Sequence, residues 1–166
     1  TGLASHGTTF VVCSLLLLAV ALVFGQAVRF DFVNFDDDVY VYKNLHLRQV
    51  SPSPGIGWAF TSLYAGNWHP LTWLSHMLDW NLFGANASGH HLVSLLLHIG
   101  AVIFLLLFLN KTTNNLWPSA FATALFAVHP LRVESVAWAA ERKDVLSMFF
   151  GMAALYAYAF YAESPK

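Results

Sequence analysis

Hydrophobic residues in this chain form long runs instead of the short alternating patterns of soluble proteins. Runs at 10–28, 92–109 and 145–162 contain 18 or 19 residues each. At ~1.5 Å per residue, helices of this length cover the ~30 Å hydrocarbon core of a bilayer. A fourth run at 117–128 is shorter and needs part of the following segment to reach across. The pattern predicts an all-α, polytopic membrane bundle of about four spans.

The polar segments between these runs divide the chain into three parts. We expect a first transmembrane segment at 1–29, an external loop at 30–90, and three further transmembrane segments within 91–166. The last part contains a tight hairpin at 110–116 and a second external connection at 130–143. A cleavable signal peptide is the alternative interpretation of the first segment, but the later runs make the protein integral either way.

The two ends of the chain indicate a fragment. Residue 1 is Thr, not Met, and Lys166 closes the chain shortly after the last apolar run, without a closing domain. We therefore expect the C-terminal remainder of a longer protein to be missing.

Two interfacial helices are expected inside the long loop. The Ser-Pro-Ser-Pro-Gly segment at 51–55 predicts a turn, and a short helix follows at 56–64. A second helix is predicted at 70–83, since Pro70 suits a first helical position and Gly84 a stop. Its large apolar residues recur at i, i+4 and i+7: Trp73, Met77 and Trp80. This spacing predicts a helix in the interface plane, where tryptophan rings prefer to lie.

Composition supports a lipid environment. The chain is 57% hydrophobic and only 10% charged, whereas soluble domains carry about 25% charged residues. A net charge of −1 supplies no basic field for polyphosphate, which argues against nucleic acid as a partner. Cys13 is the only cysteine, so a disulfide or a cysteine-based zinc site within the chain is excluded. The lipid bilayer is thus the first partner that we expect.

Charged residues are distributed unequally between the two expected sides. With four spans, eight of nine acids and six of eight Lys and Arg residues fall on the side of the long loop. The positive-inside rule would make this side cytoplasmic, but the loop is at the length limit of the rule and the first span lacks a basic flank. Charge alone does not decide the orientation, although it shows on which side the chemistry lies.

Three consecutive carboxylates, Asp36, Asp37 and Asp38, follow the first span. Like charges this close resist joint ionisation, so one pKa should rise while another stays low, which suits a general base or a metal ligand. A solvated turn is the alternative. The flanking residues are too apolar for a freely solvated loop, which favours acids held against the membrane surface or another helix.

A second group of ionisable residues occupies the 130–143 connection and its borders. If 131–144 is helical, Glu134 and Glu141 lie seven residues apart on one stripe. Charges at the edge of a span are costly and should be paired, hydrated or functional. Pairing of Arg132 with Glu134, or of Arg142 with Glu141, is the structural alternative.

Histidines are the third group. His91 and His98 share one face of the second span, and His69 and His76 one face of the interfacial helix. The zinc motif H-E-x-x-H is absent. Lone intramembrane histidines more often hydrogen-bond between helices than bind metal, so the former is the favoured interpretation.

Four stretches, in this order, resemble the membrane half of the transmembrane and tetratricopeptide-repeat-containing (TMTC) proteins, particularly their bacterial relatives. They lie at 32–38, 67–72, 91–98 and 126–138, with 142–147 behind the last. The resemblance implies a GT-C glycosyltransferase that takes a sugar from a polyprenyl-phosphate carrier and delivers it to a hydroxyl acceptor on the non-cytoplasmic side. In animal members the sugar is mannose and the acceptor is Ser or Thr of a protein. It also implies a bacterial inner membrane location, or the endoplasmic reticulum in a eukaryote, and partners bound through missing tetratricopeptide repeats.

The resemblance also implies roles for individual residues. Asp36 and Asp37 would be the catalytic pair, one taking the acceptor proton as the anomeric carbon is attacked with inversion. The residues expected to bind substrate are Asp38, His69, His129, Arg132, Glu134, Arg142 and Asp144. Arg142 or Arg132 would bind the lipid phosphate, and Trp73 and Trp80 would lie beside the lipid chain. Animal members usually have arginine at the position of His69. A divalent cation, Mg²⁺ or Mn²⁺, is a candidate cofactor, with Asp36, Asp37 and Glu134 as ligands.

Two other functional classes remain open on the sequence. A non-catalytic membrane anchor for a C-terminal repeat domain would use the acids only as surface pairs. An ion-coupled transporter would be expected to carry acids deep within its spans. Here every acid except Glu163 lies at one edge, which favours chemistry at the lipid surface.

Overall fold

A computed structural model describes residues 6–48 and 52–163 of the chain. Regular structure in these two ranges is entirely helical, which confirms the predicted all-α class. The main helices are α1 (His6–Phe24), α2 (Pro52–Thr61), α3 (Pro70–Phe83), α4 (Ala87–Thr113), α5 (Leu116–Ala127), α6 (Arg132–Ala137) and α7 (Arg142–Glu163). Short helical turns are η1 (Gly25–Arg29), η2 (Asp38–Tyr42), η3 (Tyr64–Gly66) and η4 (Ala139–Glu141).

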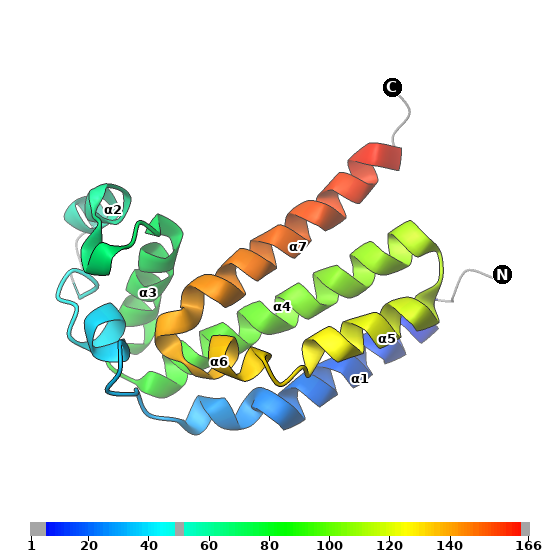
Figure 1. Ribbon diagram of the computed structural model, residues 1–166, viewed down its shortest axis with the longest axis horizontal. Coiled ribbons are helices and arrows are strands. Elements are labelled where there is room, and N and C mark those ends of the chain that lie inside the picture. The colour runs from blue at the N-terminus through cyan, green and yellow to red at the C-terminus, as the bar shows by residue number, and fades with distance from the viewer. Residues whose placement is uncertain (1–5, 49–51, 164–166) are drawn as a thin grey trace.

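Three helical stretches of the described residues are long and apolar enough to cross a membrane: Gly7–Arg29, Ala87–Thr113 and Ala139–Glu163. The expected fourth span is α5, whose 12 residues cover only ~18 Å. It ends at Ala127 because Pro130 disfavours helical geometry in the residues just before it. The chain still returns to the end from which α4 starts, through α5 and the segment after it (Figure 1). The described residues therefore contain three helices of spanning length and one shorter apolar helix.

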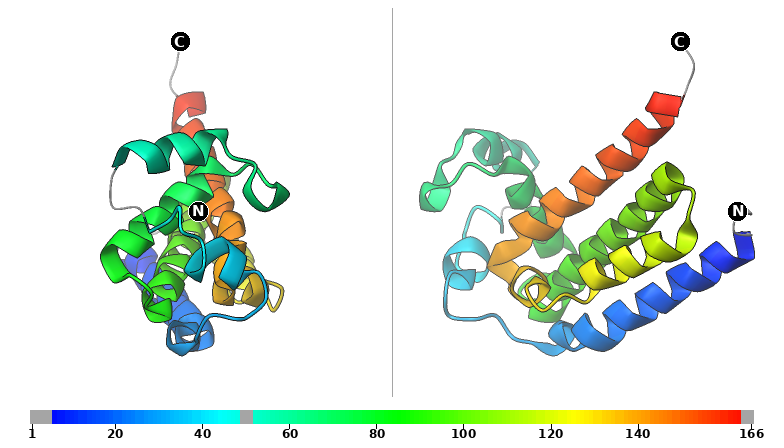
Figure 2. Two further views of the ribbon diagram at one scale, coloured as in Figure 1. Left: turned by 90° about the vertical axis from the view of Figure 1, so that its left-hand side faces the viewer. Right: turned by 45° about the vertical axis from the view of Figure 1, so that its right-hand side comes forward.

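Helix α4 is the centre of the bundle and contacts α1, α5 and α7 (Figures 1 and 2). One face of α1 is buried at every fourth residue, because that spacing keeps side chains on one side of a helix. These residues are Val12, Leu16, Val20 and Phe24. They pack with Leu95, Val102 and Leu106 of α4. The opposite face of α1 exposes large apolar side chains such as Phe10 and Leu22, as expected for a lipid-facing surface.

Helices α2 and α3 form a separate layer outside the bundle, here called the external layer, at the end where the long loop lies (Figure 2). Helix α3 has the predicted bounds, with Pro70 at its start and Gly84 after its end in a positive-φ conformation. The predicted turn at 51–55 is wrong within the described residues, since α2 begins at Pro52. Proline is tolerated in the first turn of a helix, where its missing N–H has no intrahelical partner.

The tryptophans of α3 do not lie where the sequence predicted. Trp73 is completely buried and packs with Leu47, Ala59 and Met77 under the external layer. The outward face of α3 instead carries Leu71, Leu78 and Leu82. The aromatic rings of the external loop supplied enough apolar surface to bury Trp73 inside the protein, so this residue holds the layer together and does not line a lipid surface.

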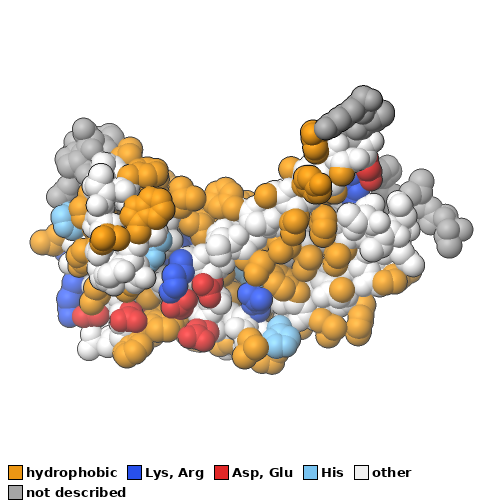
Figure 3. All heavy atoms as spheres, turned by 45° about the horizontal axis from the view of Figure 1, so that its top comes forward, with side chains coloured by type: hydrophobic (Ala, Val, Ile, Leu, Met, Phe, Trp, Pro, Cys, Tyr) orange, Lys and Arg blue, Asp and Glu red, His pale blue; other side chains and the backbone are white. Residues whose placement is uncertain are grey.

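Charged side chains gather at the end of the molecule that carries the external layer (Figure 3). At the opposite end, Lys111 of α4 forms an ion pair with Glu163 of α7. The two ends of the bundle therefore differ in charge as the sequence predicted, and the candidate chemistry lies at one of them.

Close packing of α4 against α7 depends on Gly100. A Cβ atom at this position would lie 2.5 Å from the Phe149 ring, whereas one at Gly151 would meet nothing within 4 Å. We expect Gly100→Ala to destabilise the protein by about 1–3 kcal/mol through overpacking, and Gly151→Ala to be neutral or slightly stabilising because alanine favours helix. Unfolding of both variants in detergent, measured by loss of helical circular dichroism, compares them. Equal stabilities would show that α4 and α7 are not in tight contact.

Candidate functional site

The three aspartates after the first span have three different environments. Asp36 is exposed and has a left-handed backbone, with φ at 62°. Asp37 is fully buried. Asp38 forms an ion pair with Lys43 at 3.0 Å. The triplet is therefore neither a uniform solvated turn nor a single carboxylate cluster.

Asp37 joins the long loop at 30–90 to the connection at 130–143. One of its carboxylate oxygens accepts a hydrogen bond from the Val33 N–H at 2.9 Å, and the other accepts from the Ala140 N–H at 2.8 Å. Next to it, the Trp138 indole donates to the Phe35 carbonyl at 3.2 Å. The bonds from Ala140 and Trp138 each join residues 103 positions apart, and they hold the aspartate segment against η4.

Two of the aspartates have shifted pKa values in opposite directions. Burial raises the pKa of Asp37, and the neighbouring Asp36 charge adds a smaller increase. The hydrogen bond and charge of Lys43 lower the pKa of Asp38. The predicted split within the triplet thus occurs, but its main cause is loss of hydration at Asp37 and not repulsion between carboxylates.

The second connection is not one helix. The backbone is extended at Trp138, with ψ at 120°, so α6 ends there and Glu134 and Glu141 do not share a stripe. Glu141 pairs with Lys143 at 2.6 Å and not with Arg142. Glu134 is exposed on α6.

The other predicted substrate residues of this connection are spread around it. His129 is exposed, and its Nδ1 accepts from the Leu131 N–H at 3.3 Å. The Arg132 guanidinium lies over the Phe126 ring, 4.6 Å from its centroid. Asp144 accepts a hydrogen bond from the Ser135 hydroxyl at 3.2 Å. The structure brings none of these side chains into hydrogen-bonding contact with Asp36 or Asp37.

Arg142 lies inside the protein, where a lipid phosphate does not reach it. Its side chain is completely buried and forms an ion pair with Asp79 of α3 at 2.7 Å. Its remaining N–H groups donate to the Ser75 and Ser94 hydroxyls and to the His90 carbonyl. The expected phosphate contact of Arg142 is therefore absent from this arrangement, because all three guanidinium nitrogens already have protein acceptors.

Sequence reasoning missed Asp79 as a functional residue. The available signal was its place on the same face as Trp73 and His76, because a carboxylate on the buried face of a short helix needs a cationic partner. Burial raises the pKa of Asp79, and the adjacent guanidinium opposes that rise.

An apolar groove of about 560 Å³ lies between the external layer and the start of α7. Phe60, Trp68 and Leu71 line one wall, and Leu146 and Phe150 line the other. Two ionisable side chains at the groove, His69 and Lys143, come from opposite walls. Burial lowers the pKa of His69, and the positive charge of Lys143 lowers it further against a smaller opposing effect of Glu141, which favours a neutral imidazole. Lys143 follows Ala140 by three residues, so one short segment both bonds to Asp37 and lines the groove.

The predicted interhelical role of histidine is confirmed at one position. The buried His98 ring contacts the Ala127 carbonyl of α5 through Nε2 at 2.9 Å. His69 precedes α3 and packs against Tyr40 and Trp73. His76 is completely buried, and burial lowers its pKa well below the usual value, so it is neutral.

Comparison with known proteins identifies relatives of the chain. It is 33% identical to mouse protein O-mannosyl-transferase TMTC1 over 157 residues, which are 87% of this chain and 16% of that protein. Identity is 32% to human TMTC1, over 95% of the chain and 18% of the relative, and 30% to mouse TMTC3, over 87% and 16%. These homologues are TMTC-family protein O-mannosyl-transferases. No protein-family model matches the chain, and no solved structure matches it significantly.

The chain spans less than a fifth of the length of the TMTC1 and TMTC3 relatives that it matches. The end of the bundle that carries the long loop contains the exposed Asp36, the buried Asp37 bonded to Ala140, and the apolar groove that Lys143 lines.

Proposed function

We propose that this chain is the membrane part of a TMTC-type mannosyltransferase, of GT-C architecture, acting on the non-cytoplasmic face of the bacterial inner membrane or of the endoplasmic reticulum. The donor would be mannose on a polyprenyl phosphate, and the acceptor a Ser or Thr hydroxyl of a protein. The observation that carries this proposal is that buried Asp37 ties the loop bearing the exposed Asp36 to Ala140, three residues before Lys143 of the apolar groove.

The two aspartates have separate tasks in this mechanism. Asp36 is the base, because its carboxylate is open to an acceptor, whereas both oxygens of Asp37 are bonded to backbone N–H groups. Asp37 positions the segment by fastening it to Ala140. The acceptor hydroxyl gives its proton to Asp36 as its oxygen attacks the anomeric carbon.

The donor fits the groove by its chemistry. An isoprenoid chain is apolar and would lie along the walls formed by α2, α3 and α7, and its phosphate would lie by Lys143. As the new glycosidic bond forms, the bond between the anomeric carbon and the phosphate oxygen breaks. The lipid phosphate leaves with the electron pair, and the ammonium of Lys143 offsets its growing charge. Attack opposite the leaving group inverts the anomeric carbon.

The expected cation ligands do not converge. Each carboxylate oxygen of Asp37 accepts a hydrogen bond from a backbone N–H, and Asp38 is paired with Lys43. Asp36 and Glu134 are exposed on different elements, and the described residues group neither of them with other metal-binding side chains. No step of the proposed reaction therefore passes through Mg²⁺ or Mn²⁺ at these acids.

Filling the groove should impair use of the donor. Ser147 lines the groove from α7, and Ala154 lies on the same helix two turns further on, outside the groove. We expect Ser147→Trp in the full-length protein to raise the KM for polyprenyl-phosphate mannose by about tenfold or more, equivalent to about 1.4 kcal/mol of binding. Ala154→Trp should leave it unchanged. Radiolabelled mannose transfer at varied donor concentration measures the KM of both variants. An unchanged KM in Ser147→Trp would show that the donor does not bind in the groove.

A non-catalytic membrane anchor is the second candidate. The observation that favours it is that two predicted site residues, Asp37 and Arg142, have internal bonding roles. The two candidates differ in whether Asp36 is needed for activity, because its exposed side chain makes no bond that a scaffold would need. Loss of wild-type transfer activity on substitution of Asp36 would support the enzyme, and absence of transfer by the wild-type protein would support the anchor.

A further inference from the structure

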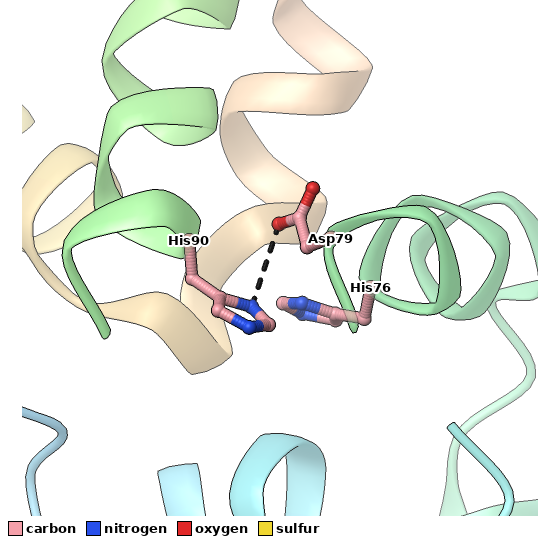
Figure 4. A group of neighbouring side chains, drawn as sticks. All are labelled: His76, Asp79 and His90. Atoms are coloured by element: carbon pink, nitrogen blue, oxygen red, sulfur yellow. Dashed lines mark ion pairs between the residues drawn. The ribbon is translucent and has the colours of Figure 1, made fainter. Parts of the chain in front are cut away.

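The face of α3 opposite the outer leucines directs two ligand-type side chains toward the start of α4. His76 and Asp79 are three residues apart on α3 and so share one helix face, and His90 lies near the first turn of α4. The three side chains point toward one another (Figure 4). One potential ligand atom from each lies within 4.8 Å of the other two. All three residues are completely buried.

The hydrogen bonds of His90 identify its protonated nitrogen. Its Nε2 lies 3.0 Å from the Gly84 carbonyl oxygen. A carbonyl can only accept, so Nε2 carries the hydrogen, and in a neutral imidazole Nδ1 then presents a lone pair. That lone pair faces the Asp79 carboxylate, with 3.4 Å between Nδ1 and Oδ2. The Arg142 guanidinium lies 2.7 Å from this Oδ2 and offsets the carboxylate charge, but Nδ1 of His90 has no hydrogen-bond partner among the described residues.

His76 and Asp79 have unused bonding capacity at the same place. Both ring nitrogens of His76 are buried without a hydrogen-bond partner among the described residues, and so is Oδ1 of Asp79. Buried polar groups are rarely left unpaired, and each such group calls for a bound water or ion. A single bound cation would engage His76, His90 and Asp79 together.

We propose that His76, Asp79 and His90 bind a divalent metal ion of the zinc class, which fastens α3 to α4. Two imidazole nitrogens and one carboxylate oxygen are typical zinc ligands, whereas Mg²⁺ and Ca²⁺ prefer oxygen donors alone. Tetrahedral zinc with bonds of about 2.0–2.1 Å needs ligand atoms about 3.3 Å apart. The ligand side chains therefore draw together when the ion binds.

Groups around the three ligands already hold them in position. The Gly84 carbonyl fixes the orientation of the His90 ring, as the outer partner of a metal-binding histidine commonly does. Arg142 contacts Asp79 through Oδ2, the same oxygen that faces His90, so the ion would share this oxygen with Arg142 or bind Oδ1 after rotation of the carboxylate. Since Asp79 and Arg142 neutralise one another, the ion brings positive charge into the site. A water or hydroxide completes the fourth position, and hydroxide offsets part of that charge.

The proposed ion has a structural task that differs from the proposed transferase chemistry. It lies among buried side chains, and its ligands come from α3 and α4, the elements on the two sides of Gly84 and Asn86. Binding of a ligand to the folded state alone raises stability. The ion would therefore secure the external layer on the bundle whether or not the groove binds a lipid.

Metal binding by the purified chain in detergent tests the proposal. We expect about one zinc per chain by elemental analysis, a lower Tm after chelation, and recovery of that Tm with Zn²⁺ but not with Mg²⁺. Co²⁺ added to the chelated protein should give the intense visible absorption of four-coordinate cobalt. A chelated protein that gains neither Tm from Zn²⁺ nor that absorption from Co²⁺ would overturn the proposal in favour of a protonated His90 paired with Asp79.

Matched histidine variants test the choice of ligands. His76→Ala should weaken Co²⁺ binding beyond the about 10–100-fold that loss of an outer partner costs. His91→Gln is the control, since His91 is also completely buried and adjacent to His90 but outside the group of three. Equal loss of Co²⁺ binding in both variants, or none in either, would contradict the assignment. If His76→Ala fails to fold, the wild-type Tm and Co²⁺ measurements still decide whether the chain binds the metal.

Discussion

Asp36→Asn should abolish mannose transfer by the full-length protein while leaving the fold intact. The amide cannot take the acceptor proton, and loss of a general base lowers the rate by about 10²–10⁴-fold. Asparagine is well suited to this test because it tolerates the left-handed backbone, with φ at 62°, that Asp36 adopts. The side chain is exposed, so no internal hydrogen bond of the described protein is expected to be lost.

The control for this prediction is Asp31→Asn. Asp31 is an exposed carboxylate at the start of the same loop, and the substitution makes the same change of charge. Initial rates with saturating donor and acceptor, together with membrane content and helical circular dichroism, separate loss of chemistry from loss of protein. Wild-type transfer by Asp36→Asn would refute the base assignment, whereas absence of transfer by the wild-type protein itself would favour the membrane anchor.

Substitution of Asp37 should reduce stability as well as activity. Asp37→Asn retains one acceptor oxygen but replaces the other with a donor, so one of the Val33 and Ala140 N–H groups loses its partner. A buried unpaired donor costs about 1–3 kcal/mol. Lower stability would therefore accompany lower activity in Asp37→Asn, whereas Asp36→Asn should lose activity alone.

Breaking the buried pair between Asp79 and Arg142 should have the largest effect on stability. Arg142→Met leaves the Asp79 carboxylate buried beside α4 without its cation, and removal of one partner from such a pair costs about 3–5 kcal/mol. The loss should appear as a lower urea midpoint for unfolding in detergent. Lys143→Met is the control, since Lys143 is the next residue of α7 and its side chain is 42% exposed.

A double substitution tests whether the stability depends on the pair or on the arginine alone. Adding Asp79→Leu to Arg142→Met removes both charges, and an apolar pair of similar volume is often as stable as the buried ion pair. We expect the double variant to be more stable than Arg142→Met when both are measured in chelator, so that metal binding does not contribute. Equal or lower stability of the double variant would show that the Ser75 and Ser94 hydrogen bonds of Arg142, and not its charge, hold α7 in place.

Much of the site was predictable at the level of segments, but little at the level of side chains. Three consecutive carboxylates after a span indicated an important loop, and their apolar flanks indicated that the acids are held against a surface; the split in pKa was attributed to repulsion, whereas burial of Asp37 is its main cause. The sequence did not show which of the three aspartates is buried. Asp37 is buried because it accepts a hydrogen bond from the Ala140 N–H, which lies 103 residues away in the chain. The resemblance implied that Arg142 binds the lipid phosphate. Its partner in the structure is Asp79, which lies on a different helix and was not paired with it in the sequence analysis.

The sequence by itself determined the all-helical class, the bounds of α3 and the concentration of charge at one end of the bundle. These properties depend on local rules: the length of apolar runs, proline and glycine at helix ends, and the cost of charge within lipid. Tertiary structure decided the rest: the burial of Trp73, the break at Trp138, the Asp37 anchor, the Arg142 ion pair and the group of His76, Asp79 and His90. Each depends on contacts between segments that only packing brings together, and the hydration that a side chain loses there is set by its neighbours in space, not by its neighbours in the chain.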